Sequence, residues 1–120
     1  LFKLLESEGE YTTIIEISDQ VSHRSINSSL REFLAHQKAN AYHKLSMNQW
    51  AKWMGASHYY RNYDYLRQAK DAYQALIRDY PKRSDIKMSK QVLSEIRAEL
   101  ARHESEVGKL NATKRLSNYL

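Results

Sequence analysis

Apolar residues recur along this chain at steps of three and four, the period of one helix face. The longest such series is Ile86, Leu93, Ile96, Leu100, His103 and Val107. It predicts a long amphipathic helix that begins after a capping Ser84 and runs to about Glu106, before Gly108. Asn111 is expected to cap a final short helix that ends at Leu120.

A second helix is predicted over about residues 65–79, with Asp64 as its N-cap. Ala69, Tyr73 and Leu76 share one face of it. Pro81 should end it, because a proline ring disfavours helix in the residue before it and has no N–H to donate.

The first half of the chain divides into shorter helices. Leu1, Leu4 and Leu5 mark one apolar face, which Gly9 should end. A run of three isoleucines, Ile14, Ile15 and Ile17, follows it. That run would also suit a strand, but the Gly9 stop and the lack of a partner strand favour a helix.

Two further helices are predicted in the middle of the chain. Ser29 and Glu32 have the spacing of a capping box, which should begin a helix that runs to about Leu45. The segment 49–54 is expected to form another short helix, ended by Gly55.

Composition agrees with an all-α chain. The 120 residues include only three glycines and one proline, too few for the turns of a sheet protein. This length supports one modest core, and no apolar run approaches the roughly 20 residues of a membrane span. The absence of cysteine excludes disulfides and thiolate metal sites. Since the chain begins at Leu1, we expect a fragment or a processed chain.

Alternating helices and tight turns are typical of stacked helical hairpins. In the 34-residue tetratricopeptide repeat, the second helix carries a small residue at the helix crossing, then an aromatic and an apolar residue, and often a terminal proline. Ala69, Tyr73, Leu76 and Pro81 match that series. Weaker units place Ile14 and Ala51 at the crossing. We therefore predict stacked antiparallel hairpins in a solenoid fragment, with approximate units 1–28, 29–57, 58–84 and 85–120 in one domain.

Residues 63–108 resemble the outer-membrane β-barrel assembly lipoproteins of the BamD/ComL family. The matching positions are Ala69, Ala72, Tyr73, Leu76, Ile77, Tyr80 and Pro81, then Leu100, Ala101, His103, Glu104 and Val107. The resemblance implies a periplasmic, outer-membrane-associated scaffold that holds the barrel-inserting subunit. The lipid-bearing N-terminal cysteine of that family is absent from this chain.

No catalytic residues, cofactor or metal site are predicted. The serines lack a hydrolase elbow, and the scattered glycines cannot form a phosphate-cradling loop. His36 and His43 lie seven residues apart, about 10 Å along a helix, which is too far for one metal ion. His103 lies on an apolar stripe and is expected to pack between helices with a nitrogen bonded to a neighbour.

Aromatic residues concentrate between Trp50 and Tyr65. This cluster is expected either to pack between hairpins or to form a partner-binding surface, since tryptophan, tyrosine and arginine are favoured at binding hot spots. The candidate partner-binding residues are Trp50, Trp53, Tyr59, Tyr60, Arg61 and Tyr63.

Charge keeps a second hypothesis open. Residues 1–19 carry a net charge of −4, residues 20–63 carry +5, and the remainder supplies +4 of the total of +5. A basic, aromatic middle segment would also suit single-stranded nucleic acid, with Arg31, Lys38 and Lys44 on one helix as the contacts. A third alternative is a helical structural subunit of a larger complex.

Overall fold

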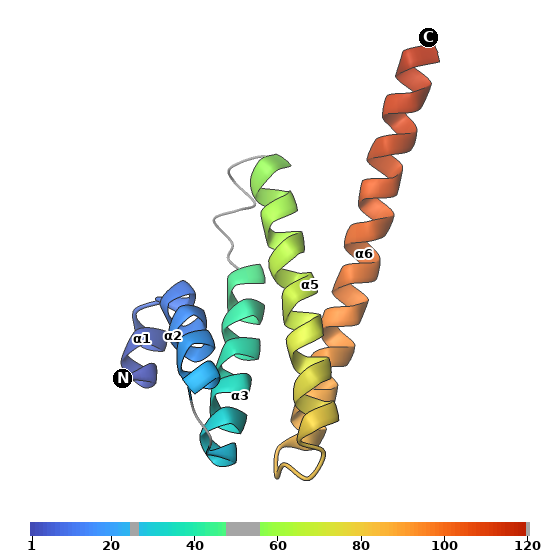
Figure 1. Cartoon of the computed structure of the whole chain (residues 1–120). Coiled ribbons are helices and arrows are strands. Elements are labelled where there is room, and N and C mark those ends of the chain that lie inside the picture. The colour runs from blue at the N-terminus through green and yellow to red at the C-terminus, as the bar shows by residue number, and fades with distance from the viewer. Residues whose placement is uncertain (25–26, 48–55, 120) are drawn as a thin grey trace.

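The computed structural model of the protein describes residues 1–24, 27–47 and 56–119 (Figure 1), with side chains described within 1–24, 27–47 and 63–105. These residues form helices and no strand, which confirms the all-α prediction. The helices are α1 (Phe2–Ser7), α2 (Tyr11–Arg24), α3 (Ser28–Ser46), α5 (Ala56–Asp79) and α6 (Ile86–Tyr119).

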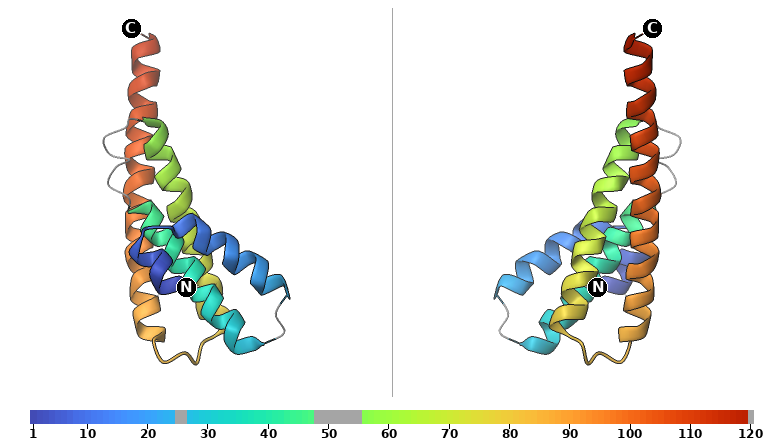
Figure 2. Two further views of the ribbon diagram at one scale, coloured as in Figure 1. Left: turned by 90° about the vertical axis from the view of Figure 1, so that its left-hand side faces the viewer. Right: turned by 90° about the vertical axis from the view of Figure 1, so that its right-hand side faces the viewer.

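Each described helix packs against the next described one, and the α3–α5 pair makes the most extensive contact. Consecutive helices run in opposite directions, as Figure 1 shows for α3, α5 and α6. The molecule is elongated, with extents of 61 × 28 × 22 Å. The C-terminal part of α6 extends beyond the other helices in every view (Figure 2). None of the described helices is long and apolar enough to cross a membrane.

The main core joins α3, α5 and α6. Ala39 on α3 and Ala69 on α5 have no exposed surface, so the two helices approach closely there. The prediction for Ala69, Tyr73 and Leu76 is confirmed, because all three are at most 3% exposed. The remaining members of this core are Leu66, Leu93, Ile96 and Leu100.

A second buried contact joins α2 to α3. Ile14 and Ser18 lie one turn apart on α2 and are both buried, as is Leu34 on α3. Ser18 is the small buried side chain at this contact, and Ile14, the residue predicted at the crossing, is buried one turn before it. Phe2 of α1 packs edge-on against Phe33 of α3, with ring centroids 5.5 Å apart. Gly9 ends α1 as predicted, and its φ of 74° is a conformation that glycine adopts at little cost.

Two predicted helix boundaries are wrong. α5 begins at Ala56, so Asp64 lies inside the helix and does not cap it. α6 continues through Gly108 and Asn111 to Tyr119 as one helix. An interior glycine costs only about 1 kcal/mol relative to alanine, which a helix with a long buried stripe tolerates.

The predicted caps of α3 and α6 are also wrong. The Asn27 side chain caps α3 by accepting hydrogen bonds from the backbone N–H groups of Ser29 and Leu30. Ser29 and Glu32 therefore do not form the predicted capping box at the start of α3. Ser84 does not adjoin α6, because Asp85 directly precedes that helix. The predicted helix over 49–54 and the crossing residue Ala51 lie outside the described residues, and the four repeat units remain a prediction.

Candidate protein-binding surface

The turn between α5 and α6 is tied to α3 by one arginine. Arg83 donates two hydrogen bonds to Asp85, Nε to Oδ1 at 2.8 Å and Nη2 to Oδ2 at 2.9 Å. Its Nη1 donates a third to Oε1 of Glu32 at 3.2 Å. Only 12% of the Arg83 side chain is exposed. These charge-assisted bonds hold the turn in one position relative to α3.

Electrostatics in this cluster follow from the same contacts. Hydrogen bonding to Arg83 lowers the pKa of Asp85 below its ordinary value, and the same bond raises the pKa of Arg83. His36 lies nearby, with Nε2 4.0 Å from Oδ2 of Asp85. Burial, and then the Arg83 charge, lower the pKa of His36. The cluster therefore favours an ionised Asp85 beside a neutral His36 near pH 7.

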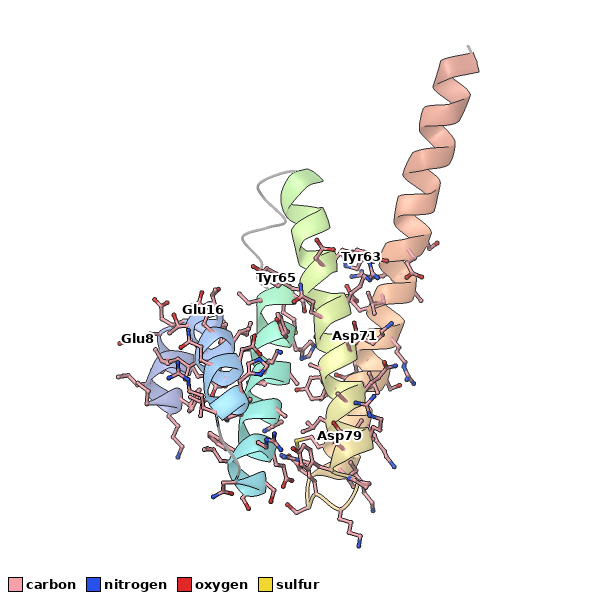
Figure 3. All side chains as sticks on the ribbon, in the orientation of Figure 1. Glu8, Glu16, Tyr63, Tyr65, Asp71 and Asp79 are labelled. Carbon is pink, nitrogen blue, oxygen red and sulfur yellow. The ribbon has the colours of Figure 1, made fainter. Side chains whose placement is uncertain are left out.

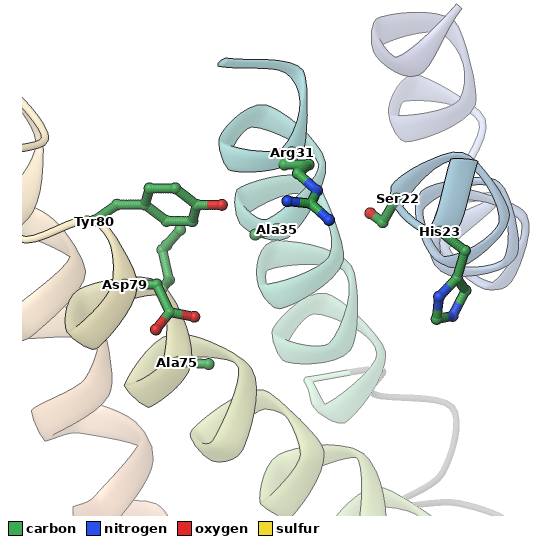
Figure 4. A pocket seen from close by; sticks show the side chains of 8 residues that line it. Ser22, His23, Arg31, Ala35, Ala75, Asp79 and Tyr80 are labelled. Atoms are coloured by element: carbon green, nitrogen blue, oxygen red, sulfur yellow. The ribbon is translucent and has the colours of Figure 1, made fainter. Parts of the chain in front are cut away.

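A pocket of about 400 Å³ opens beside this cluster, between α2, α3 and α5 (Figure 4). Arg31 of α3 and Ser22 of α2 point toward one another across it, and the Tyr80 ring extends toward α3. Its apolar lining is supplied by alanines of α3 and α5 and by Leu76. The lining residues are Ser22, His23, Arg31, Ala35, Ala75, Leu76, Asp79 and Tyr80.

A second pocket of about 340 Å³ adjoins the first, because Asp79 and Tyr80 line both. It lies along the α5–α6 turn, and its lining residues are Glu32, Asp79, Tyr80, Pro81, Lys82 and Arg83. We call the two pockets together the Tyr80 groove. It runs from the end of α2, past the N-terminal turns of α3, to the α5–α6 turn.

Most of the predicted partner-binding residues lie outside the part of the chain whose side chains the structure describes. Trp50 and Trp53 lie outside the described residues. Tyr59, Tyr60 and Arg61 lie in the first turns of α5, but their side chains are outside the described part of the chain.

Tyr63 is the one candidate with a described side chain, and it faces α6 (Figure 3). Its hydroxyl donates to Oε1 of Glu104 at 3.1 Å, and its ring centroid lies 6.2 Å from that of His103. The Arg67 guanidinium lies 5.9 Å from the ring centroid. Partial burial and the Glu104 bond raise the pKa of Tyr63. Tyr63 thus helps join α5 to α6 while part of it stays accessible.

Tyr65 lies two residues further on and faces the opposite side of α5. Its ring centroid is 6.5 Å from that of Tyr42 on α3 (Figure 3). The described part of the aromatic cluster therefore divides between two helix interfaces and does not form one strip.

The cations proposed for nucleic-acid binding do not remain a free row on α3. Lys38 pairs with Asp19 of α2, with Nζ 2.6 Å from Oδ1. This pair joins the acidic N-terminal segment to the basic middle one, which neutralises part of the charge asymmetry seen in the sequence.

The histidines of α3 have separate surroundings. The ring of His43 packs edge-on against Tyr73, with centroids 6.4 Å apart, and burial lowers its pKa. His36 lies beside Asp85 instead. Among the described residues, no group of three or more histidine, aspartate or glutamate side chains is placed to hold a metal ion. His103 packs as predicted, with Nε2 3.3 Å from Glu99 Oε1.

Sequence reasoning missed the Tyr80 groove. Its lining comes from segments around 22, 31 and 80, which no local pattern links. The available signal was the YPKRSD turn at 80–85, where charged residues follow the proline closely.

The described helices form an all-α antiparallel stack in which Ala69 is buried at the α3–α5 contact and α5 ends before Pro81. This arrangement defines the class of tetratricopeptide-like helical scaffolds. The chain belongs to the YfiO family, described as outer membrane lipoprotein, which matches residues 20–117. The family resemblance seen over 63–108 is therefore confirmed and extends through most of the chain. At family level this is an outer-membrane-assembly helical scaffold. Comparisons with curated proteins and with solved structures found no significant match.

Proposed function

We propose that this chain is a non-enzymatic scaffold that binds partner proteins on the periplasmic side of the outer membrane during outer-membrane protein assembly. Membership of the YfiO family over residues 20–117 carries this proposal. The elongated stack of helices supports it, because such folds present long surfaces to partners.

Two surfaces are proposed to take part. One is the Tyr80 groove, which opens on α2, α3 and α5. The other comprises the candidates Trp50, Trp53, Tyr59, Tyr60, Arg61 and Tyr63. Tyr63 supports the second surface, since an aromatic ring flanked by Arg67 has the composition of a binding hot spot.

Site-specific photo-crosslinking in a bacterium that expresses the chain tests this function. A photoreactive residue replaces Ala75 in the groove or Tyr60 in the aromatic segment, and Met88, which is 68% exposed on α6, serves as the control position. Specific adducts with envelope proteins from either test position, absent from the control, are expected. Adducts confined to cytosolic proteins, or none above control, would contradict the proposal.

A further inference from the structure

The charges that line the Tyr80 groove are not balanced. Of its carboxylates, Asp79 pairs with Arg78, whose Nε lies 3.0 Å from Oδ1, and Glu32 pairs with Arg83. In the described part of the chain, no carboxylate lies within 4.0 Å of Arg31 or of the Lys82 ammonium group. The groove therefore keeps one unpaired cation on α3 and another on the α5–α6 turn.

The two pockets have the size for side chains and not for a whole helix. At about 400 and 340 Å³, each is near the lower end of the about 300–1,000 Å³ typical of small-ligand pockets. The half-buried Ala35 and Ala75 line part of the first pocket with apolar surface, and the buried Leu76 lies behind them. Tyr80, shared by both pockets, offers an apolar ring and a hydroxyl group.

Polar groups converge at one end of the first pocket. The Arg31 guanidinium and the Ser22 hydroxyl point toward one another, and the Tyr80 hydroxyl is directed toward the same helix as Arg31 (Figure 4). A guanidinium binds a carboxylate through two parallel hydrogen bonds, and hydroxyl groups can donate to the remaining lone pairs of the carboxylate.

We propose that the Tyr80 groove binds an extended segment of a partner protein in which an aspartate or glutamate adjoins an apolar side chain. The carboxylate binds Arg31, the apolar side chain contacts the half-buried Ala35 and Ala75, and Lys82 attracts a second acidic residue further along. This inference rests on the proposed scaffold function and adds the chemistry of the segment that it binds.

The same charges favour a peptide over a nucleic acid. Asp79 and Glu32 lie in the groove together with Arg31 and Lys82. A continuous row of phosphates would lie against those carboxylates. A peptide can instead place its acidic side chains at the cations and neutral residues elsewhere.

Selection of short random peptides displayed on phage tests the proposal, with the purified full chain as target. We expect enrichment of sequences in which aspartate or glutamate adjoins an apolar residue. Binding of an enriched peptide, labelled and measured by fluorescence anisotropy, should weaken about ten- to hundredfold in an Arg31→Glu, Lys82→Glu double variant. Replacing its acidic residues by asparagine or glutamine should weaken binding similarly.

The matched control is an Lys90→Glu, Arg97→Glu double variant. Both residues are exposed on α6, whose described side chains do not line the groove, and each pair of reversals changes the net charge by the same amount. It should bind the peptide as the unchanged chain does. Arg31→Glu should preserve the fold, because acidic residues near a helix N-terminus interact favourably with the helix dipole. Thermal unfolding followed by circular dichroism checks this point.

Three results would overturn the inference: no enriched peptide, enrichment without acidic residues, or equal affinity for the groove and control variants. Its failure is distinguishable from failure of the scaffold function. Envelope adducts at Tyr60, together with no enrichment of acidic peptides, would contradict only the groove proposal. Enrichment of acidic peptides whose binding depends on Arg31, without any envelope adduct, would support the groove proposal and contradict the envelope function.

Discussion

Arg83 and Glu32 are separated by 51 residues in the chain, yet Nη1 of the arginine lies 3.2 Å from Oε1 of the glutamate. The arginine also binds Asp85 through two hydrogen bonds. One side chain thereby couples the turn after Pro81 to the N-terminal part of α3. Because Glu32 and Arg83 both line the Tyr80 groove, this contact also sets the position of one of its walls.

Removing Arg83 should therefore destabilise the protein. Arg83→Gln leaves two carboxylates, each about one-third exposed, without their charge-assisted donor. We expect the free energy of unfolding in urea to fall by about 1–2 kcal/mol. The matched control is Arg78→Gln, since the Arg78 side chain is 75% exposed and, among the described residues, forms an ion pair only with its neighbour Asp79. Equal effects of the two substitutions would show that the Arg83 contacts add nothing beyond those of a surface pair.

Enlarging Ala69 should disrupt the α3–α5 interface. Ala69 has no exposed surface and shares its core cluster with the equally buried Ala39. Ala69→Leu should lower stability by about 1–3 kcal/mol through overpacking. Ala98→Leu introduces the same side chain at an exposed position of α6 and should have little effect on the unfolding midpoint. A mild effect at Ala69 would mean that close approach of the helices at this residue is not required.

His43 should make stability depend on pH in the weakly acidic range. Burial against Tyr73 lowers its pKa from the ordinary 6.5, so the unfolded chain takes up a proton more readily. The stability that depends on a neutral His43 is fully present above pH 6.5. It is lost as pH falls below 6.5 toward the lowered folded-state pKa. NMR titration of the His43 ring, assigned with His43→Gln, measures this pKa. A value at or above 6.5 would contradict the expectation.

Tyr73 should make stability depend on pH in the alkaline range. Burial, and then the Asp85 charge, raise its pKa from 10.0 to about 12. Between these values the unfolded chain loses the phenolic proton first, so stability falls as pH rises through this range. Tyr73→Phe should remove that part of the decline, as urea unfolding at several alkaline pH values would show. An unchanged slope in the variant would indicate that Tyr73 ionises normally in the folded protein.

The helical class could be read from local pattern because each signal acts within a few turns. The interval from Ala69 to Pro81 predicted a buried helix face and a stop, and both are confirmed. The stripe Leu93, Ile96 and Leu100 likewise predicted the buried face of α6. Boundaries were less well predicted, since Asp64, Gly108 and Asn111 are compatible with a helix interior when packing elsewhere holds the helix.

The candidate site was less accessible to sequence reasoning. The aromatic segment was visible as a cluster, but Tyr63 and Tyr65 point to opposite sides of α5, toward α6 and α3. Helical geometry turns each residue about 100° from the one before it. Residues two positions apart therefore seldom belong to one surface, even when they stand together in the chain.

Sequence pattern was sufficient to predict that the described segments are helical, that Ala69 is a small buried residue on α5, and which family the chain belongs to. Only the tertiary structure places Ser22, Arg31 and Tyr80 around one groove, and only it pairs Glu32 with Arg83 and Lys38 with Asp19. The physical reason is the distance along the chain over which each interaction acts. Helix periodicity and capping act over a few residues, whereas a groove and its charge balance depend on how whole helices dock.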